Sequence, residues 1–293
     1  MDLFPDARRA VEADAAGPRV WDLDIAAERA AARRAAAAEP REEVAEVAGV
    51  DAAWEGRRVP CRLYTPADVR EGVVVHLHGG GFVFNDIEVH DAACRRLANR
   101  TRLRVLSVDY RRPPEHRFPA APDDVDTVLR WMDADPLLGA LPAYVHGDSA
   151  GGNLALVAAL RNPGRFRAAA LIYPFLDPTA SAPSYAVEGG WAEEARWYWQ
   201  QYAAGPEDLT NPDLAPLLSD GLAGLPPTLV VSAEGDILVD EDEAFAHRLA
   251  GLGVEVVAFR AVGQVHGFWR HGLTFPAAGS VMAMTAAFFA EHP

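Results

Sequence analysis

The sequence predicts an α/β protein with a mostly parallel central sheet flanked by helices. Short apolar or β-branched runs alternate with helical stretches along most of the chain, and half of the 293 residues are hydrophobic. Such alternation is typical of a parallel sheet buried on both faces. A chain of this length can bury a large core within one domain.

The expected elements follow in order. Residues 1–45 are rich in Ala, Arg and Glu and helical in pattern, up to Glu39-Pro40, where a helix should stop. Strands are expected near 46–50, 59–64, 73–77, 104–108, 141–145, 168–173, 227–232 and 254–259, and helices near 88–100, 121–133 and 153–160, from about 240, and at the C-terminal end. From 174 to about 218 this rhythm breaks, and residues 191–202 form a helical stretch dense in aromatic residues.

One short motif suggests chemistry. Gly147-x-Ser149-x-Gly151 lies between a predicted strand and a predicted helix. A serine on such a sharp turn exposes its hydroxyl, and the flanking glycines let strand and helix approach closely. The structural alternative is a glycine-rich turn that merely precedes a helix, so the motif needs support from elsewhere in the chain.

A second motif, His78-Gly79-Gly80-Gly81-Phe82, follows the predicted strand at 73–77. Three glycines could form only a flexible turn, or they could present bare backbone N–H groups to a ligand. Acyl transfer requires such donors, because its tetrahedral intermediate carries a negatively charged oxygen. We assign this oxyanion hole to the N–H groups of Gly80, Gly81 and Ala150, the residue after the serine.

A carboxylate and a histidine complete the set in chain order. Asp236 follows the predicted strand at 227–232, and Asp240 or Asp242 are its alternatives. Asp240 suits the N-cap of the next helix, since Asp is a favoured capping residue, which leaves Asp236 free to orient an imidazole.

The histidine is His266, in the loop after the predicted strand at 254–259. His247 lies inside a predicted helix and His271 lies deeper in the following element. A lone histidine is usually structural, but His266 completes the order Ser, Asp, His. We therefore predict Ser149, Asp236 and His266 as a catalytic triad.

With these motifs the chain resembles the hormone-sensitive-lipase-like carboxylesterases, a family of α/β-hydrolases with an HGGG loop and a GDSAG elbow. Further matching stretches are 109–111, 114–121 and 211–217. The resemblance implies a helical cap formed by residues 1–45 and by an insertion at 175–218, on a catalytic domain at 46–293. It implies hydrolysis of small-molecule esters through an acyl-enzyme intermediate, with no cofactor.

Other functions on the same fold stay open at this point. A biosynthetic deacetylase, an amidase or a lactonase would use the same residues, and some relatives of this kind act as lyases or cyclases. A ligand-binding receptor is a further alternative. The intact triad disfavours a receptor, and the glycines of the HGGG loop favour hydrolysis over elimination or cyclisation.

The acyl pocket is predicted from the aromatic-rich helix. Phe82, Trp191 and Trp197 are the expected lining residues, with Trp197 facing the serine; helix phase alone leaves Trp191 and Tyr198 as alternatives. Large rings close to the serine would leave room for few methylene groups. We therefore expect a preference for short acyl chains.

Composition excludes several partners. The net charge of −15, from 42 acidic and 27 basic residues, disfavours nucleic acid and anionic membranes. The first residues lack the basic and apolar regions of a signal peptide, and no stretch is long enough to span a membrane.

Cys61 and Cys94 are expected as buried, reduced thiols of a cytoplasmic protein. No metal-ligand spacing stands out, because His76 and His78 share a strand face by simple alternation. Oligomeric state stays open; the resemblance implies that a homodimer would use the sheet edge at 254–259.

Overall fold

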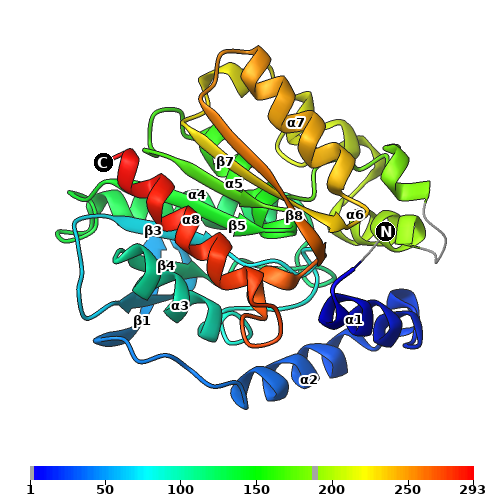
Figure 1. The fold of residues 1–293 in the computed structure, drawn as a ribbon. Coiled ribbons are helices and arrows are strands. Elements are labelled where there is room, and N and C mark those ends of the chain that lie inside the picture. Colours follow the sequence, from blue (N-terminus) through cyan, green and yellow to red (C-terminus); the bar gives the residue numbers. More distant parts are fainter. Residues whose placement is uncertain (1–2, 187–190) are drawn as a thin grey trace.

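In the computed structural model, which describes residues 3–186 and 191–293, eight strands form one sheet in the order β1-β2-β4-β3-β5-β6-β7-β8 (Figure 1). Strands β3 to β8 are mutually parallel, whereas β2 is antiparallel to both of its neighbours. The expected α/β class is thereby confirmed. The strands are β1 (Glu46–Trp54), β2 (Arg57–Thr65), β3 (Val73–Leu77), β4 (Arg104–Val108), β5 (Ala143–Asp148), β6 (Ala169–Ile172), β7 (Thr228–Gly235) and β8 (Val256–Val265).

Helices cover both faces of the sheet and enclose two apolar cores. Strand β3 shows why: Val73 and Val75 point into one core and Val74 into the other, as the two-residue period of a strand requires. The helices are α1 (Pro5–Ala15), α2 (Ile25–Ala37), α3 (Asp91–Thr101), α4 (Ala120–Ala134), α5 (Ala150–Arg161), α6 (Trp191–Tyr202), α7 (Val239–Gly251) and α8 (Ala277–Glu291). Residues of α4, α5 and α7 pack in the first core, and residues of α3 and α8 in the second.

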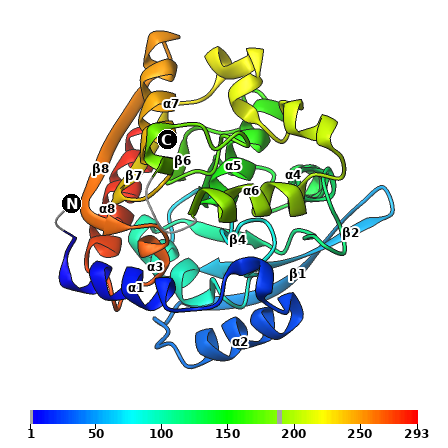
Figure 2. The same ribbon diagram turned by 90° about the vertical axis from the view of Figure 1, so that its right-hand side faces the viewer.

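The N-terminal helices α1 and α2 lie side by side along one side of the molecule (Figures 1 and 2). The start of α1 is tied to β8 by a hydrogen bond from Phe4 N–H to Gly263 O, 3.1 Å long. Helix α2 is tied to the segment after the glycine run, because Arg29 Nε donates to Val83 O at 2.8 Å and Arg33 pairs with Asp86. The N-terminal segment thus reaches the loop that follows the glycines.

Strands β1 and β8 extend furthest beyond their predicted ends. Strands β1 and β2 form a hairpin whose two-residue loop, Glu55-Gly56, has positive φ at both positions (48° and 82°). Positive φ at both positions defines the type I′ turn that matches the twist of paired strands, so β1 continues to Trp54 rather than ending near residue 50. Strand β8 continues to Val265, directly before His266.

The contact between strand β5, helix α5 and strand β3 leaves no room for side chains. A Cβ atom on Gly147 would overlap the carbonyl of Gly151, and one on Gly151 would overlap the carbonyl of Leu77. The two glycines therefore allow helix α5 to leave the sheet directly after Ser149.

We expect Gly151→Ala to destabilise the fold by at least about 3 kcal/mol, because backbone must shift to accept the methyl group. Gly279→Ala is the matched control: it lies in helix α8 with open space around its Cα, and alanine there should stabilise by about 0.5 kcal/mol. Urea unfolding of both variants measures the difference. Equal stabilities would show that the contact at Gly151 is not tight.

Candidate active site

Ser149 lies at the turn between β5 and α5, at the carboxyl end of the parallel strands. Its φ and ψ are 56° and −123°, a region that non-glycine residues rarely adopt. The turn is held by hydrogen bonds on both sides: Ser149 N–H donates to Ile172 O at 2.9 Å, and Ser149 O accepts from Asn153 N–H at 3.1 Å. The strained backbone is thus fixed by the neighbouring strand and helix.

Sheet order brings the three predicted residues of the triad together. Asp236 and His266 follow Gly235 and Val265, which are paired across β7 and β8. His266 Nε2 lies 2.9 Å from Ser149 Oγ, and His266 Nδ1 lies 2.6 Å from Asp236 Oδ2. Both distances are hydrogen bonds, so the imidazole bridges the hydroxyl and the carboxylate.

The acid and the base differ in exposure. The side chain of Asp236 is completely buried, whereas that of His266 keeps 42% of its surface exposed. The second oxygen of Asp236 accepts a hydrogen bond from Leu238 N–H at 3.0 Å. The carboxylate is therefore held from behind while the imidazole edge stays open toward solvent.

The capping role expected of Asp240 is not observed. Helix α7 begins at Val239, and Asp240 lies within its first turn, where it accepts from Ser184 N–H at 2.8 Å. Asp242 is completely buried further along the helix. Asp236 lies in the short connection between β7 and α7, where its carboxylate accepts the hydrogen bond from Leu238 N–H. The residue pattern around the helix start did not predict this.

The glycine run lies next to Ser149 because β3 pairs with β5. The register aligns Leu77 with Gly147, so the residues that follow each strand emerge at the same level. Gly80 and Gly81 both have positive φ, 118° and 59°. Within the described residues, neither of their N–H groups donates a hydrogen bond. Ala150 is the first residue of α5, whose N–H has no partner earlier in the helix.

Asp148 connects the elbow to the glycine run. Its Oδ1 accepts a hydrogen bond from Gly79 N–H at 3.0 Å, which ties the elbow to the glycine run. Burial raises the pKa of Asp148 to about 6, despite the opposing charge of Arg270 and the hydrogen bond from Gly79. The carboxylate is therefore a shared structural anchor of the two motifs.

Helix α6 lies over the glycine run through Tyr198. A Cβ atom on Gly81 would overlap the Tyr198 ring, so ring and glycine are in contact. Trp197, the ring predicted to face the serine, stacks on Phe84 with ring centroids 6.3 Å apart, and Tyr198 lies edge-on to the same Phe84 at 6.2 Å. Of the two rings, Tyr198 is the one that contacts Gly81. The contact favours Tyr198, one of the alternatives that helix phase left open.

The other predicted pocket residues lie on either side of this contact. Phe82 is completely buried and stacks on Tyr202, with ring centroids 3.8 Å apart. Trp191 is half-buried at the first position of α6. Only the backbone of Phe82 adjoins Gly81, since its side chain packs in the core with Trp199 and Phe175.

Several arginines connect helices α2 and α6 to the rest of the chain. Arg111 forms a bidentate ion pair with the buried Asp124, and Arg29 of α2 pairs with Glu115 at 2.8 Å. Arg117 donates to the carbonyls of Gln200 and Ala203 at the end of α6. The charged segment 109–117 thus connects helices α2 and α6 to helix α4.

Comparison with known proteins now identifies the fold family. A family model described as "alpha/beta hydrolase fold" matches residues 74–270. The chain belongs to this family. It is 34% identical to ethyl acetate hydrolase of Pseudomonas putida, over 81% of this chain and 80% of that protein. It is 33% identical to an arylesterase of Saccharolobus solfataricus, over 80% of each.

Solved structures agree with these relatives. The hyperthermophilic esterase of Pyrobaculum calidifontis superposes with a TM-score of 0.86 at 35% identity, covering 98% of this chain and 97% of that one. The resemblance to hormone-sensitive-lipase-like carboxylesterases is thereby confirmed, and the protein is a carboxylic ester hydrolase. No helix in the described parts of the α/β-hydrolase chain is long and apolar enough to cross a membrane.

Sequence reasoning missed Tyr173, which follows strand β6. Its ring packs against His266, with centroids 4.7 Å apart, and its hydroxyl accepts from Trp269 N–H at 3.3 Å. It holds one face of the imidazole. No motif marks this tyrosine; its only signal is that it ends a strand lying between those of Ser149 and Asp236.

The pH profile of kcat/KM should reflect the environment of His266. Partial burial of the ring lowers the pKa of His266, but the charge of Asp236 and its hydrogen bond more than offset this, so the pKa lies above its ordinary value of about 6.5. A general base must be neutral to accept a proton. Activity should therefore be low in acid and rise through an inflection above pH 6.5.

The measurement is kcat/KM for a short ester between pH 4.5 and 9. His271→Ala is the control and should leave the inflection unchanged, because His271 lies away from the triad beside Glu39. A wild-type profile that is flat, or that rises only below pH 6, would contradict the assignment of His266 as base.

Proposed function

We propose that the protein hydrolyses short-chain acyl esters by a serine-nucleophile mechanism. The carrying observation is the continuous set of contacts from Ser149 Oγ through His266 to Asp236. In the first half-reaction, Ser149 Oγ attacks the ester carbonyl while His266 Nε2 takes its proton. The proton then passes to the leaving alcohol, and an acyl-enzyme remains.

The second half-reaction repeats these steps with water as nucleophile. His266 takes a proton from water, the hydroxide attacks the acyl carbonyl, and the proton returns to Ser149 Oγ as the acid departs. Asp236 holds the imidazole by Nδ1 and stabilises the imidazolium without accepting its proton. The N–H groups of Gly80, Gly81 and Ala150 stabilise the oxyanion of both tetrahedral intermediates.

The preference for short acyl chains is supported by the closeness of helix α6. The Tyr198 ring touches Gly81, and Ser149 exposes only 7% of its surface. A methylene group that fits contributes about 0.8 kcal/mol of binding, whereas one that does not fit costs strain. We infer that Tyr198 limits the length of the acyl chain.

Two further predictions are compatible with the structure. Cys61 and Cys94 are buried free thiols, as expected for a cytoplasmic protein. Strand β8 forms one edge of the sheet, and Val257 and Val262 on it are 42% and 62% exposed. The cytoplasmic location and a homodimer through β8 stay predictions.

Ser149→Ala should lower kcat by on the order of 10⁶-fold with the fold intact, because it removes only the attacking oxygen. His266→Ala should lose a similar factor, and the double variant hardly more, because the triad acts as a unit. Steady-state kinetics on p-nitrophenyl acetate, with circular dichroism as the folding control, tests this. Multiplicative losses in the double variant would refute the shared mechanism.

Tyr198→Ala should shift the optimum of kcat/KM toward longer acyl chains, because it removes the ring that contacts Gly81. Wild type should prefer chains of about two to six carbons, given the limited room at the serine. Trp197→Ala is the matched control: it removes a neighbouring ring of the same helix that packs on Phe84. A p-nitrophenyl ester series gives both profiles. A shift in the control but not in Tyr198→Ala would overturn the assignment.

A further inference from the structure

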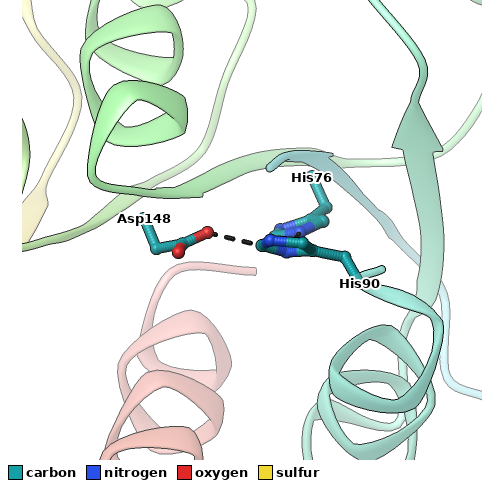
Figure 3. A group of neighbouring side chains, drawn as sticks. All are labelled: His76, His90 and Asp148. Atoms are coloured by element: carbon teal, nitrogen blue, oxygen red, sulfur yellow. Dashed lines mark hydrogen bonds and ion pairs between the residues drawn. The ribbon is translucent and has the colours of Figure 1, made fainter. Parts of the chain in front are cut away.

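Three buried side chains from separate parts of the chain meet behind the nucleophile elbow. His76 lies on β3, His90 directly precedes α3, and Asp148 ends β5. Figure 3 shows the Asp148 carboxylate directed at the edge of the His90 ring, with His76 beside it. The two histidines are completely buried and Asp148 is 4% exposed. The proposed esterase mechanism uses neither imidazole.

Two of the three distances between these atoms are close to those expected for ligands of one metal ion. One nitrogen of each ring and one oxygen of Asp148 lie within 4.8 Å of one another. His76 Nε2 lies 3.2 Å from His90 Nδ1, which lies 3.7 Å from Asp148 Oδ1. Bonds of about 2.0–2.1 Å in a tetrahedral site place ligand atoms roughly 3.3 Å apart. A hydrogen bond between the two imidazoles would explain the 3.2 Å distance from His76 to His90. It would not explain the position of Asp148, because 3.7 Å from His90 is too long for a hydrogen bond.

The chemistry of the donors also fits. Both imidazole rings are completely buried, and burial disfavours the charged imidazolium form. A neutral imidazole offers a lone pair to a metal without losing a proton first. His76 Nδ1 lies 3.0 Å from His146 Nδ1. A hydrogen bond there, donated by His76, would direct the Nε2 lone pair to the site, as outer partners of metal ligands do.

We propose that His76, His90 and Asp148 bind one divalent transition-metal ion of the zinc type. Two imidazoles and a carboxylate suit Zn²⁺ or Co²⁺ and exclude the oxygen-seeking Mg²⁺ and Ca²⁺. The single carboxylate offsets half of the charge of the ion. A water molecule would fill the fourth position, as in other three-ligand zinc sites.

The site would connect the elements that position the esterase residues. Strand β3 leads into the glycine run, and strand β5 leads into Ser149. Because the ligands are almost completely buried, the ion would enter during folding and exchange slowly afterwards. It would add to stability by binding only the folded chain. The proposal does not rest on the esterase mechanism, and its tests measure metal rather than ester hydrolysis.

The first test is metal content after refolding with Zn²⁺ or Co²⁺ and removal of free metal with a chelator. Wild type should retain about one equivalent per chain, since a buried site forms with the fold. His76→Phe and His90→Phe should each retain less than about a tenth of that, because each removes a ligand. His247→Phe, an exposed histidine on α7, should retain the wild-type amount.

A wild-type chain without bound metal would overturn the proposal and leave a hydrogen-bonded histidine cluster. Metal retained equally by all variants would overturn it as well, because the ion would then bind elsewhere. His146→Phe keeps all three ligands and should weaken Co²⁺ affinity about 10- to 100-fold through loss of the outer partner. Unchanged affinity would count against the role of His146 and the ligand geometry that depends on it.

A measurement on the wild type alone tests the site even if the variants fail to fold. X-ray absorption of the zinc-loaded chain should show only nitrogen and oxygen ligands at about 2.0–2.1 Å. A sulfur ligand at about 2.3 Å would place the ion on a cysteine and refute the site.

Discussion

The close approach of strand β5, helix α5 and strand β3 is the constraint on which the rest of the site depends. Only residues without a Cβ fit at Gly147 and Gly151. Their absence of side chains lets the chain reverse at Ser149 with a φ of 56°. The neighbouring strand and helix hold Ser149 in this conformation, so the stability of the whole fold offsets the backbone strain. The serine hydroxyl is thereby fixed at the carboxyl edge of the sheet before any substrate arrives.

Sheet order then decides which residues can reach that hydroxyl. The carboxyl ends of parallel strands lie at the same edge of the sheet. The segments that follow β3, β5, β7 and β8 therefore lie close together although they are far apart in sequence. The glycine run, Ser149, Asp236 and His266 are those segments. Their contrast in exposure suits the proposed chemistry, because the side chain of Asp236 is completely buried whereas that of His266 is 42% exposed. Helix α6 contacts the glycine run through Tyr198, and Arg117 of segment 109–117 donates a hydrogen bond to the end of this helix. Arg29 of helix α2 donates to the segment that follows the glycines.

The sequence predicted the strands, the helices and the residues now found around Ser149 because motifs and hydrophobic periodicity are local signals. Besides Tyr173, three features were not predicted. Asp240 does not cap its helix, since the N-cap is Leu238, two residues earlier. The contact of Tyr198 with Gly81 depends on how α6 packs, and helix phase alone does not set packing. The group of His76, His90 and Asp148 joins three elements and has no spacing that a linear reading would detect.

The central claim is that Ser149 is the nucleophile, and covalent labelling tests it most directly. An alkyl phosphonate with a good leaving group should modify one residue per chain, and peptide mass spectrometry should find the adduct on Ser149. Prior protonation of His266 at low pH should slow the labelling, because the attack needs a neutral base. Ser107 and Ser232 are almost completely buried and should stay unlabelled. An adduct on Ser107, Ser219 or Ser232, with Ser149 unmodified, would contradict the account.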